Sequence, residues 1–392
     1  MGTDSVIYIR TDGNSNIATG HLVRCLCIAQ ALESLGKDVC FLVSDNDSFT
    51  LLHDLATSIF EEYTFSFDVK ILETAVYNNL ELELEELKKL LNLENNSFKQ
   101  LLEVSHSLDK QLLNQHKLAQ SENSSLIKPI IFIDSYFVTE TYFSSLKEFA
   151  HIAYMDDLRA FDYNVDLVVN YDVIPPAMET EYKQAYTNAA ITLLGAEYTP
   201  LRDQFQNQKI ALRNEIKNIL ITTGGSDPYN FAPTLASYLL SLNLELEIHV
   251  VVGRLFKDTK NLEELAKQNS SLHLHYNVSD MASLMKQCDY AVSAAGTTLY
   301  ELCALGIPSI SISMADNQIP MAETFADVDA VPYAGDIRVS TTLELEIVLH
   351  RIFDSLVTLQ ENMDNYVKQQ NNMHCLVDGN GAIKIAEELC KL

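Results

Sequence analysis

One pattern near the N-terminus limits the fold of this chain more than any other. Residues 6–9 form an apolar run, and residues 10–20 follow it as a polar loop with two glycines. Apolar residues then recur at helical spacing from Leu22 to Leu35, and residues 38–43 have the character of a second strand. Strand, loop, helix and strand make a βαβ unit, which predicts a parallel sheet with a right-handed crossover.

The loop of this unit lies at the carboxyl end of its strand, where open α/β sheets bind their ligands. His21 stands at the mouth of the loop, where the helix begins. An imidazole can act as a base near neutral pH, so His21 is a candidate general base. The alternative is that His21 only packs or caps the helix, and this unit alone does not decide between the two. The glycine spacing fits neither a phosphate loop with its lysine nor a dinucleotide fingerprint.

Length and charge narrow the class of protein. The chain has 392 residues, which fits two domains of about 150 to 200 residues each. Its formal net charge of −27 argues against nucleic acids and anionic membranes as partners, because both require a basic surface. No apolar stretch approaches the roughly 20 residues that span a bilayer, so we expect no membrane insertion. A strand follows the N-terminus almost at once, so we expect no signal peptide and a cytoplasmic protein.

Cysteine and histidine usage gives no sign of a metal site. The seven cysteines contain no CxxC pair, which is typical of free thiols in a reducing compartment. His273 and His275 alternate in a strand-like run, but a pair without a third ligand is more often structural. We therefore expect neither a metal nor a cofactor.

Polar side chains follow three further apolar runs in the first half, at residues 130–136, 152–157 and 165–171. Because the carboxyl ends of parallel strands meet at one edge of a sheet, these side chains should lie on the same edge as His21. For any one acid taken singly, a helix cap or a loop hydrogen bond is the commoner role. The polar residues at these strand ends are Asp134, Tyr136, Asp156, Asp157 and Asn170.

Residues 61–125 interrupt the alternation of strands and helices. Leucines recur there at intervals of three and four residues, and a polar cluster at 92–96 separates them. This pattern predicts two or three helices, which we interpret as an insertion in the first domain. We expect the insertion to cover the sheet edge or to contact a second copy or another enzyme, and we expect no catalytic role for it.

The second half repeats the alternation and predicts a second doubly wound α/β domain. The join falls in the charged, glutamine-rich stretch 202–216, so we place the two domains at 1–208 and 209–392. The final helix, 382–392, is expected to pack back across the domains. The predicted strands of the second domain are 216–222, 246–253, 272–276, 290–293 and 307–312.

Two glycine-bearing turns in the second domain predict a diphosphate site: Gly224-Gly225-Ser226 and Gly296-Thr297-Thr298. Glycine lets a backbone approach an anion closely, and the free N–H groups at a helix start carry partial positive charge. Each turn by itself is a common helix entry, but two in one domain favour a phosphate role. Glu301 lies one turn after Thr297 on the same helix face, where it could accept both hydroxyls of a ribose. It could equally form a capping box with Thr298.

Taken together, these segments resemble a known family. Two doubly wound domains with such turns resemble the GT-B fold of nucleotide-sugar enzymes. More closely, the chain resembles the UDP-2,4-diacetamido-2,4,6-trideoxy-β-L-altropyranose hydrolases of pseudaminic acid biosynthesis and the related spore-coat polysaccharide proteins. The matching segments are 10–14, 20–24, 133–136, 155–157, 169–170, 224–230, 299–301 and 316–318.

The resemblance implies a GT-B-like α/β fold with two Rossmann-like domains facing each other across a cleft and a helical insertion in the first. It implies that His21 is the general base. Two departures stand out: Ala18 occupies a position where the family usually has glycine, and the 61–125 insertion is extra. The implied substrate contacts are Asp12, Gly20, Tyr136, Asn317 and Gln318. The implied nucleotide contacts are Gly224, Gly225, Ser226, Asn230, Gly296, Thr297, Thr298 and Glu301.

The function implied is hydrolysis of a UDP-linked acetamido-trideoxy sugar at the anomeric C1–O bond, with inversion and without a metal. UDP and free sugar would be the products, for pseudaminic acid or surface polysaccharide synthesis. Two alternatives remain open: a UDP-sugar-dependent glycosyltransferase of GT-B fold, and a non-catalytic nucleotide-sugar-binding protein in polysaccharide assembly. The expected partners are the UDP-sugar substrate and, through the 61–125 helices, a second copy or a pathway enzyme.

Overall fold

The structure is a computed structural model. It describes residues 6–14, 17, 19–59, 67–73, 79–91, 128–209, 211, 213–257, 259–338 and 341–392. The chain divides into two compact units, which are described separately below. One contains residues 1–169, 183–193 and 386–392, and the other contains residues 170–182 and 194–385. The boundary between residues 208 and 209 stays a prediction.

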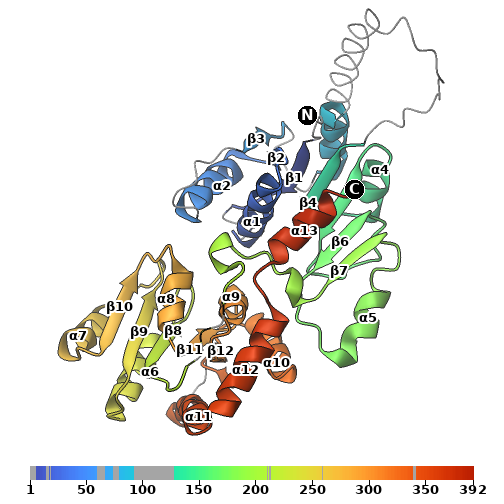
Figure 1. The fold of residues 1–392 in the computed structure, drawn as a ribbon. Coiled ribbons are helices and arrows are strands. Elements are labelled where there is room, and N and C mark those ends of the chain that lie inside the picture. The colour runs from blue at the N-terminus through green and yellow to red at the C-terminus, as the bar shows by residue number, and fades with distance from the viewer. Residues whose placement is uncertain are drawn as a thin grey trace, which may run out of the picture. The chain divides into compact units, whose positions relative to one another are not determined.

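The first sheet has seven strands in the order β3-β2-β1-β4-β5-β6-β7 (Figure 1). The pairings from β3 through to β6 are all parallel. The strands are β1 (Ile7–Thr11), β2 (Val39–Val43), β3 (Asp68–Ile71), β4 (Ile130–Asp134), β5 (His151–Met155), β6 (Leu167–Asn170) and β7 (Ile191–Leu194).

Helices connect these strands as a parallel sheet requires. Helix α1 packs against β1 and β2, and α2 packs against α1 and β3. All five residues of β1, β2 and β4 are buried, so the centre of this sheet is covered on both faces. The helices are α1 (Gly20–Ser34), α2 (Asn46–Ile59), α4 (Glu140–Leu146) and α5 (Glu179–Gln184), together with helical residues 80–91.

Strand β3 corrects one prediction about the segment 61–125. Residues 68–71 were expected to belong to a helical insertion, but they pair with β2 as the edge strand of the sheet. The sequence hid this strand because three of its four residues are exposed, so the strand has no apolar pattern. Helical residues 80–91 agree with the prediction, and their Leu87 and Leu91 are buried. Residues 61–66, 74–78 and 92–125 of the predicted insertion, and Ala18, lie outside the described residues.

The second sheet has six strands in the order β10-β9-β8-β11-β12-β13, all paired in parallel (Figure 1). Its strands are β8 (Asn218–Thr222), β9 (Glu247–Val252), β10 (Leu272–Tyr276), β11 (Tyr290–Ala294), β12 (Ser309–Ser313) and β13 (Tyr333–Asp336). The helices are α6 (Phe231–Ser241), α7 (Lys260–Gln268), α8 (Met281–Gln287), α9 (Thr297–Leu305), α10 (Gln318–Asp327), α11 (Thr342–Glu361), α12 (Met363–Leu376) and α13 (Gly381–Leu389). Three 3₁₀ turns are η1 (Pro176–Met178), η2 (Ala196–Tyr198) and η3 (Asp203–Phe205).

This second sheet is buried on both faces, as a doubly wound domain requires. Ile219 and Ile221 of β8 join a core formed with α6, α7 and α11. Leu220, which lies between them, joins a second core formed with α8, α9 and α10. Successive side chains of β8 enter opposite cores because neighbouring residues of a strand point to opposite faces of the sheet. The two-domain parallel α/β class predicted from the sequence is therefore confirmed.

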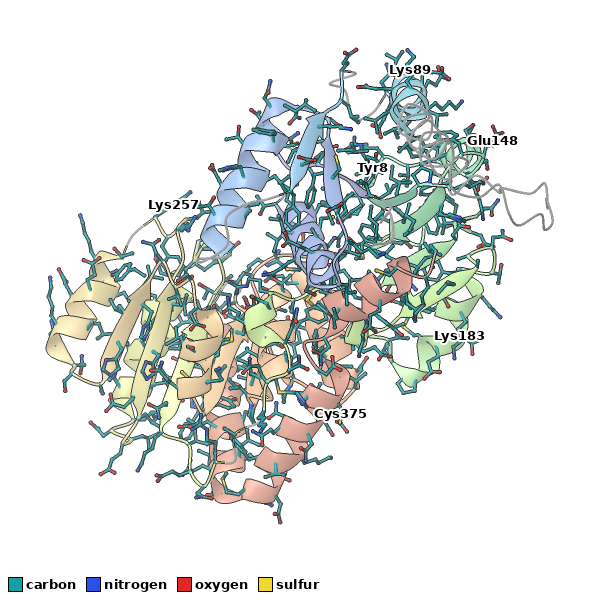
Figure 2. All side chains as sticks on the ribbon, turned by 45° about the horizontal axis from the view of Figure 1, so that its top comes forward. Tyr8, Lys89, Glu148, Lys183, Lys257 and Cys375 are labelled. Carbon is teal, nitrogen blue, oxygen red and sulfur yellow. The ribbon has the colours of Figure 1, made fainter. Side chains whose placement is uncertain are left out.

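Several elements gave no clear sequence signal. Strand β7 is only partly buried, and β13 contains Gly335 at a φ of 137°, so neither has an apolar pattern. Six of the helices are also not predicted from the sequence, namely α2, α4, α5, α10, α11 and α12. Among the described residues, no helix is long and apolar enough to cross a membrane. All seven cysteines are free thiols, as predicted, and Cys375 is exposed on α12 (Figure 2).

Three histidines lie together on one face of β9 and β10. Nδ1 of His249 lies 3.0 Å from Nε2 of His275, and the two rings stack at 5.2 Å. His273 stacks on His249 from the other side and pairs with Glu247 at 2.7 Å. Burial and then the neighbouring imidazoles lower the pKa of both His249 and His275, although Glu247 and Asp289 act in the opposite direction on His249. No group of three metal-ligating side chains able to hold a metal ion occurs in the described chain.

These lowered pKa values predict that the second domain loses stability in mild acid. The unfolded histidines bind protons at their ordinary pKa of about 6.5, whereas the folded ones resist protonation. Unfolding therefore takes up protons, and the melting temperature should fall as the pH drops below about 6.5. The variant His275→Gln should lose less stability between pH 7 and pH 5 than the wild type, measured by thermal denaturation. Equal losses in the two proteins would contradict this prediction.

Candidate functional site

The first candidate site forms where β1 passes into α1. Strand β1 is fully buried, and its last residues carry the chain into the polar loop at the sheet edge. Helix α1 begins at Gly20, and its N-cap residue Thr19 makes no side-chain cap hydrogen bond. A Cβ placed on Gly20 would meet no atom within 4 Å, so the space beside this glycine is open. His21 therefore lies in the first turn of a helix that starts at the edge where ligands bind.

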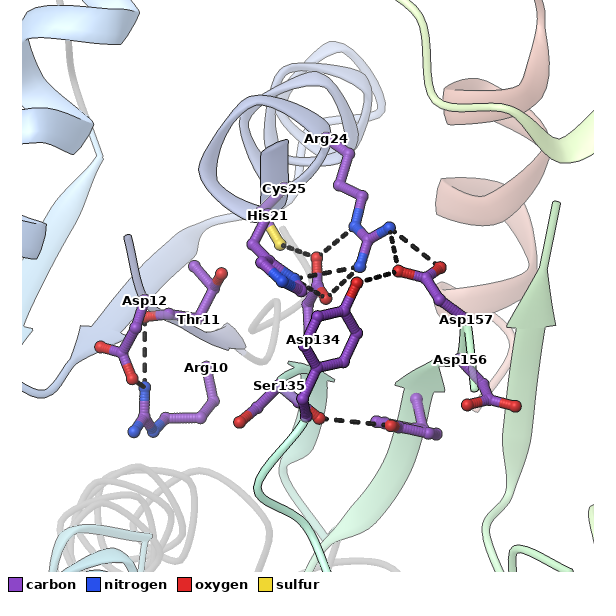
Figure 3. A network of polar contacts seen from close by, with 12 residues as sticks. Arg10, Thr11, Asp12, His21, Arg24, Cys25, Asp134, Ser135, Asp156 and Asp157 are labelled. Carbon is purple, nitrogen blue, oxygen red and sulfur yellow. Dashed lines mark hydrogen bonds and ion pairs between the residues drawn. The ribbon is translucent and has the colours of Figure 1, made fainter. Parts of the chain in front are cut away.

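His21 is paired with a buried aspartate at the end of β4. Its Nδ1 lies 2.5 Å from Oδ1 of Asp134, which is 1% exposed (Figure 3). The ring itself is 6% exposed and packs edge-on against Tyr136, with ring centroids 4.6 Å apart. The contact with Asp134 orients the ring, and the role of His21 as a general base stays a prediction.

Arg24 holds the same aspartate from one turn further along α1. Its Nε donates to Oδ2 of Asp134 at 2.6 Å, and its Nη2 donates to Oδ1 at 2.6 Å. Its Nη1 reaches Asp157, at 3.0 and 2.8 Å from the two carboxylate oxygens. The hydroxyl of Tyr136 also donates to Asp157, at 2.8 Å. One guanidinium thus ties the ends of β4 and β5 to the start of α1 (Figure 3).

These contacts define the protonation pattern of the pair. Burial alone would raise the pKa of Asp134, but the Arg24 guanidinium and the His21 hydrogen bond outweigh it and lower the pKa to about 2. Asp134 is therefore a carboxylate, which accepts hydrogen bonds and cannot donate them. A proton on Nδ1 of His21 completes the hydrogen bond to this carboxylate, and Nη2 of Arg24, which also lies 3.0 Å from Nδ1, then donates to Asp134 instead. In the neutral ring, Nε2 then keeps the lone pair that a general base needs.

Two other residues at these strand ends have structural roles. Asp156 is fully buried and accepts hydrogen bonds from the hydroxyls of Tyr163 and Tyr186, as well as from two loop N–H groups. The side chain of Asn170 accepts a hydrogen bond from the N–H of Asp172. Both shape the loops that follow β5 and β6. For Asp156 the loop hydrogen-bond alternative considered from the sequence is the one observed.

A second buried network fixes the loop after β1. The guanidinium of Arg10 forms a two-pronged ion pair with Glu83, with both N···O distances 2.8 Å. Arg10 also donates to Asp12 at 2.7 Å and to Ser44 at 2.6 Å, and Tyr142 donates to Glu83 at 2.9 Å. Burial would lower the pKa of Arg10, but Glu83 and Asp12 more than offset this effect, so the pKa lies above its ordinary value. Helical residues 80–91 therefore supply a counter-ion inside the first domain.

Asp12, a predicted substrate contact, is engaged by the protein itself. Its Oδ1 accepts the N–H of Ser44 at 2.7 Å, and its Oδ2 accepts both Arg10 and the Ser44 hydroxyl. The residue is only 3% exposed. Its observed role is to anchor the loop that leads to His21, and a direct contact with substrate stays a prediction.

The first glycine turn of the second domain follows β8. Gly224 has a φ of 80°, a left-handed conformation that favours glycine. A Cβ on Gly253, just after β9, would lie 2.5 Å from the carbonyl oxygens of both Gly224 and Gly225, so the two loops pack backbone to backbone. The carboxylate of Asp227 accepts the N–H groups of Phe231 and Ala232 at the start of α6. This helix start is therefore capped by the protein, and an anion here would rely on the loop N–H groups alone.

The second glycine turn differs, because the start of α9 has no side-chain cap. A Cβ on Gly296 would meet no atom within 4 Å, and Thr297 is exposed. The first N–H groups of a helix have no partner within the helix, so this end can accept an anion. Thr223, at the end of neighbouring β8, is 3% exposed, and its hydroxyl has no partner among the described residues.

Glu301 does not form the capping box considered from the sequence. Its Oε1 pairs with Nη2 of Arg202 at 2.7 Å, and the N-cap of α9 is Gly296. The two side chains are 14% and 17% exposed, respectively. Glu301 lies one turn after Thr297 on the same helix, so it is near the open helix start.

The remaining predicted contacts lie in three segments, which follow β8, β11 and β12. Asn230 has a φ of 52° and is exposed just before α6. Asn317 is exposed at the start of α10, whereas Oε1 of Gln318 accepts the N–H of Met314 at 2.8 Å. Ser226 and Thr298 are partly buried in their turns. Roles in binding for all of these residues stay predictions.

The sequence interpretation missed three residues of these networks: Arg24, Glu83 and Arg202. Arg24 had a signal in the Gly-His-x-x-Arg spacing, because residues three apart on a helix share a face. Glu83 had none, because it is one of four glutamates between residues 81 and 86 and nothing marks it as the buried one. Arg202 is separated from Glu301 by 99 residues, so only the fold brings the pair together.

Part of the chain matches a known protein-family model. Residues 218–377 match the glycosyltransferase family 28 C-terminal domain. This range holds β8 to β13 and both glycine turns, and it leaves out the whole first sheet.

Three curated relatives share part of the chain. An uncharacterized protein of Methanocaldococcus jannaschii is 30% identical over 48% of this chain and 41% of its own length. The spore coat polysaccharide biosynthesis protein SpsG of Bacillus subtilis is 27% identical over 49% of this chain and 56% of its own. A Helicobacter pylori protein is 31% identical over 34% of this chain and 23% of its own. It is named pseudaminic acid cytidylyltransferase and UDP-2,4-diacetamido-2,4,6-trideoxy-beta-L-altropyranose hydrolase. The matches thus span between about a quarter and just over half of these relatives.

Solved structures match the whole chain at low identity. MurG of Acinetobacter baumannii aligns over 99% of this chain and all of its own, with a TM-score of 0.60 and 13% identity. UGT89C1 of Arabidopsis thaliana, in a crystal structure complexed with UDP, aligns over 99% of this chain and all of its own, with a TM-score of 0.58 and 13% identity. The chain has the GT-B fold. At this identity the likeness concerns the fold alone.

The Arg10–Glu83 pair generates a prediction on stability. The variant Glu83→Gln should lower the free energy of unfolding by about 3–5 kcal/mol, because it breaks the two-pronged buried ion pair of Arg10 and leaves Asp12 as its remaining carboxylate partner. Denaturant-induced unfolding measures this change. The control Glu85→Gln alters an exposed glutamate of the same helix and should change the stability by less than about 0.5 kcal/mol. Equal stability of Glu83→Gln and wild type would show that the pair is not needed.

Proposed function

We propose that this chain is a UDP-sugar hydrolase that cleaves the anomeric C1–O bond of an acetamido-trideoxy sugar nucleotide. In this proposal the second domain binds UDP and the first domain provides the base. The observation that carries it is the hydrogen bond between His21 and the buried carboxylate of Asp134. A histidine whose Nδ1 is held by a carboxylate is oriented to accept a proton at Nε2.

The reaction needs one proton transfer and one displacement. Nε2 of His21 takes a proton from water, and the water oxygen forms a bond to C1 of the sugar. The bond between C1 and the phosphate oxygen breaks, and UDP leaves with the electron pair. Attack opposite the leaving group inverts the anomeric centre. Backbone N–H groups at Gly225 and at the uncapped start of α9 are candidates to stabilise the charge that develops on the diphosphate.

Two comparisons support this choice of substrate. The Helicobacter pylori relative carries the hydrolase activity in its name, and the Bacillus subtilis relative is named for polysaccharide biosynthesis. A UDP complex is among the solved structures that share the fold. The 137 residues matched to the Helicobacter pylori protein are too few to carry the sugar identity over, so the acetamido-trideoxy sugar is part of the proposal.

The proposal predicts the effect of removing the base. The variant His21→Asn should lower kcat by about 10²–10⁴-fold and leave UDP affinity unchanged, because the imidazole contacts water and not the nucleotide. Release of UDP from a panel of acetamido-sugar nucleotides measures turnover, and calorimetry measures UDP affinity. A matched control is His53→Asn, which alters an exposed histidine on α2 and should leave turnover unchanged. Normal turnover by His21→Asn would remove the assignment.

A glycosyltransferase is the second candidate. The match to the glycosyltransferase family 28 C-terminal domain favours it, and a transferase would use the same two domains with an alcohol in place of water. The third candidate is a protein that binds a nucleotide sugar and does not turn it over.

One incubation without any acceptor distinguishes these candidates. In ¹⁸O-labelled water, a hydrolase should release UDP and free sugar, with the label in the sugar hydroxyl because the C1–O bond is the one that breaks. Label in the phosphate would instead indicate cleavage at phosphorus. Release of sugar only after an alcohol acceptor is added would favour the transferase, and binding of UDP without turnover would favour the binding protein.

A further inference from the structure

We infer that Arg202 is a positioning residue that orients Glu301 to recognise the ribose of the nucleotide. The inference rests on the proposed UDP site in the second domain. Arg202 lies at the N-cap of η3, before the range matched by the family 28 model, whereas Glu301 lies within that range on α9. The pair therefore joins a residue outside the matched domain to a residue inside it.

The ion pair engages only one of the two carboxylate oxygens of Glu301. Nη2 of Arg202 contacts only Oε1 of Glu301, at 2.7 Å. Among the described residues, Oε2 has no hydrogen-bond partner. A carboxylate offers about four lone pairs, so Glu301 can still accept two vicinal hydroxyl donors. The 2′- and 3′-hydroxyls of a ribose form such a pair of donors.

Arg202 is itself held in place from several sides. Its Nη1 donates to the carbonyl of Ser279, and its guanidinium lies 5.2 Å from the ring of buried Phe205. The amide of Gln204 connects η3 to the start of α8, because it donates to the Ser279 carbonyl at 3.2 Å and accepts the N–H of Ala282 at 2.9 Å. A guanidinium fixed in this way restricts the rotamers of the glutamate that it holds.

Because Arg202 holds Glu301 in place before a ligand binds, the contact between Glu301 and the ribose hydroxyls is specific. A glutamate that is already fixed loses little conformational freedom when a ligand binds, so each hydroxyl contributes more to affinity. The open start of α9 lies one turn before Glu301, which puts the hydroxyl acceptor and the anion acceptor on one helix. A nucleoside diphosphate carries both ribose hydroxyls and a diphosphate, and this combination is what the helix would select.

The test compares UDP with 2′-deoxy-UDP by isothermal titration calorimetry. Wild-type protein should prefer UDP by about ten-fold, since a hydrogen bond to a charged group contributes this order of affinity. In Arg202→Gln the preference should fall to about two-fold or less, and Glu301→Gln should behave in the same way. The double variant should lose no more preference than either single variant, because the two residues act as one unit.

Controls separate positioning from folding and from failure of the proposed site. Arg213→Gln removes a different arginine–carboxylate pair of the same domain, the one with Asp289 just before β11, and should leave the preference for UDP unchanged. Arg202→Lys keeps the charge without the guanidinium fork and should restore part of the preference. If Arg202→Gln binds UDP with an unaltered preference, the inference is overturned. If the wild type binds neither nucleotide, the proposed UDP site fails instead.

Discussion

The contact between His21, Arg24 and Asp134 is the interaction on which the proposed chemistry of the first domain depends. It places a buried carboxylate at the end of β4 between an imidazole and a guanidinium from the first turns of α1. Without Arg24, the buried charge of Asp134 would lack its guanidinium partner and keep only His21 and the weakly donating thiol of Cys25, which is costly in a low-dielectric interior. With Arg24 present, the carboxylate is stable and its hydrogen bond can orient the imidazole. The same guanidinium also contacts Asp157, so it connects the C-terminal end of β4 to the end of β5.

The loop that leads to this site rests on a second set of buried charges. Arg10 at the end of β1 pairs with Glu83 and Asp12, and Asp12 in turn holds the N–H of Ser44 after β2. All of these groups are almost fully buried, and each charge has a partner of opposite sign. Glu83 comes from a segment that the sequence presents as an addition to the domain. The structure makes the beginning of that segment part of the domain, because its carboxylate neutralises Arg10.

The second domain has two glycine turns, which differ in whether a side chain caps the helix that follows. The start of α6 is capped by Asp227, whereas the start of α9 has no side-chain cap. Both turns have the same kind of sequence, glycine followed by a hydroxyl residue. Only the placement of Asp227 four residues before Phe231 makes one of them a closed helix end. The nucleotide hypothesis therefore depends more on α9, and on Glu301 one turn into that helix.

The sequence by itself determined the architecture, because βαβ periodicity and glycine turns are local signals that extend over whole elements. It indicated both α/β domains, most central strands and the placement of His21 at a strand-to-helix loop. It did not indicate β3, β7 or β13, which are short or exposed and have no apolar pattern. The partners of the charged groups were decided only by the tertiary structure. Glu83 lies 73 residues from Arg10, Asp134 lies 113 from His21 and Glu301 lies 99 from Arg202, and no local pattern specifies pairs at such separations.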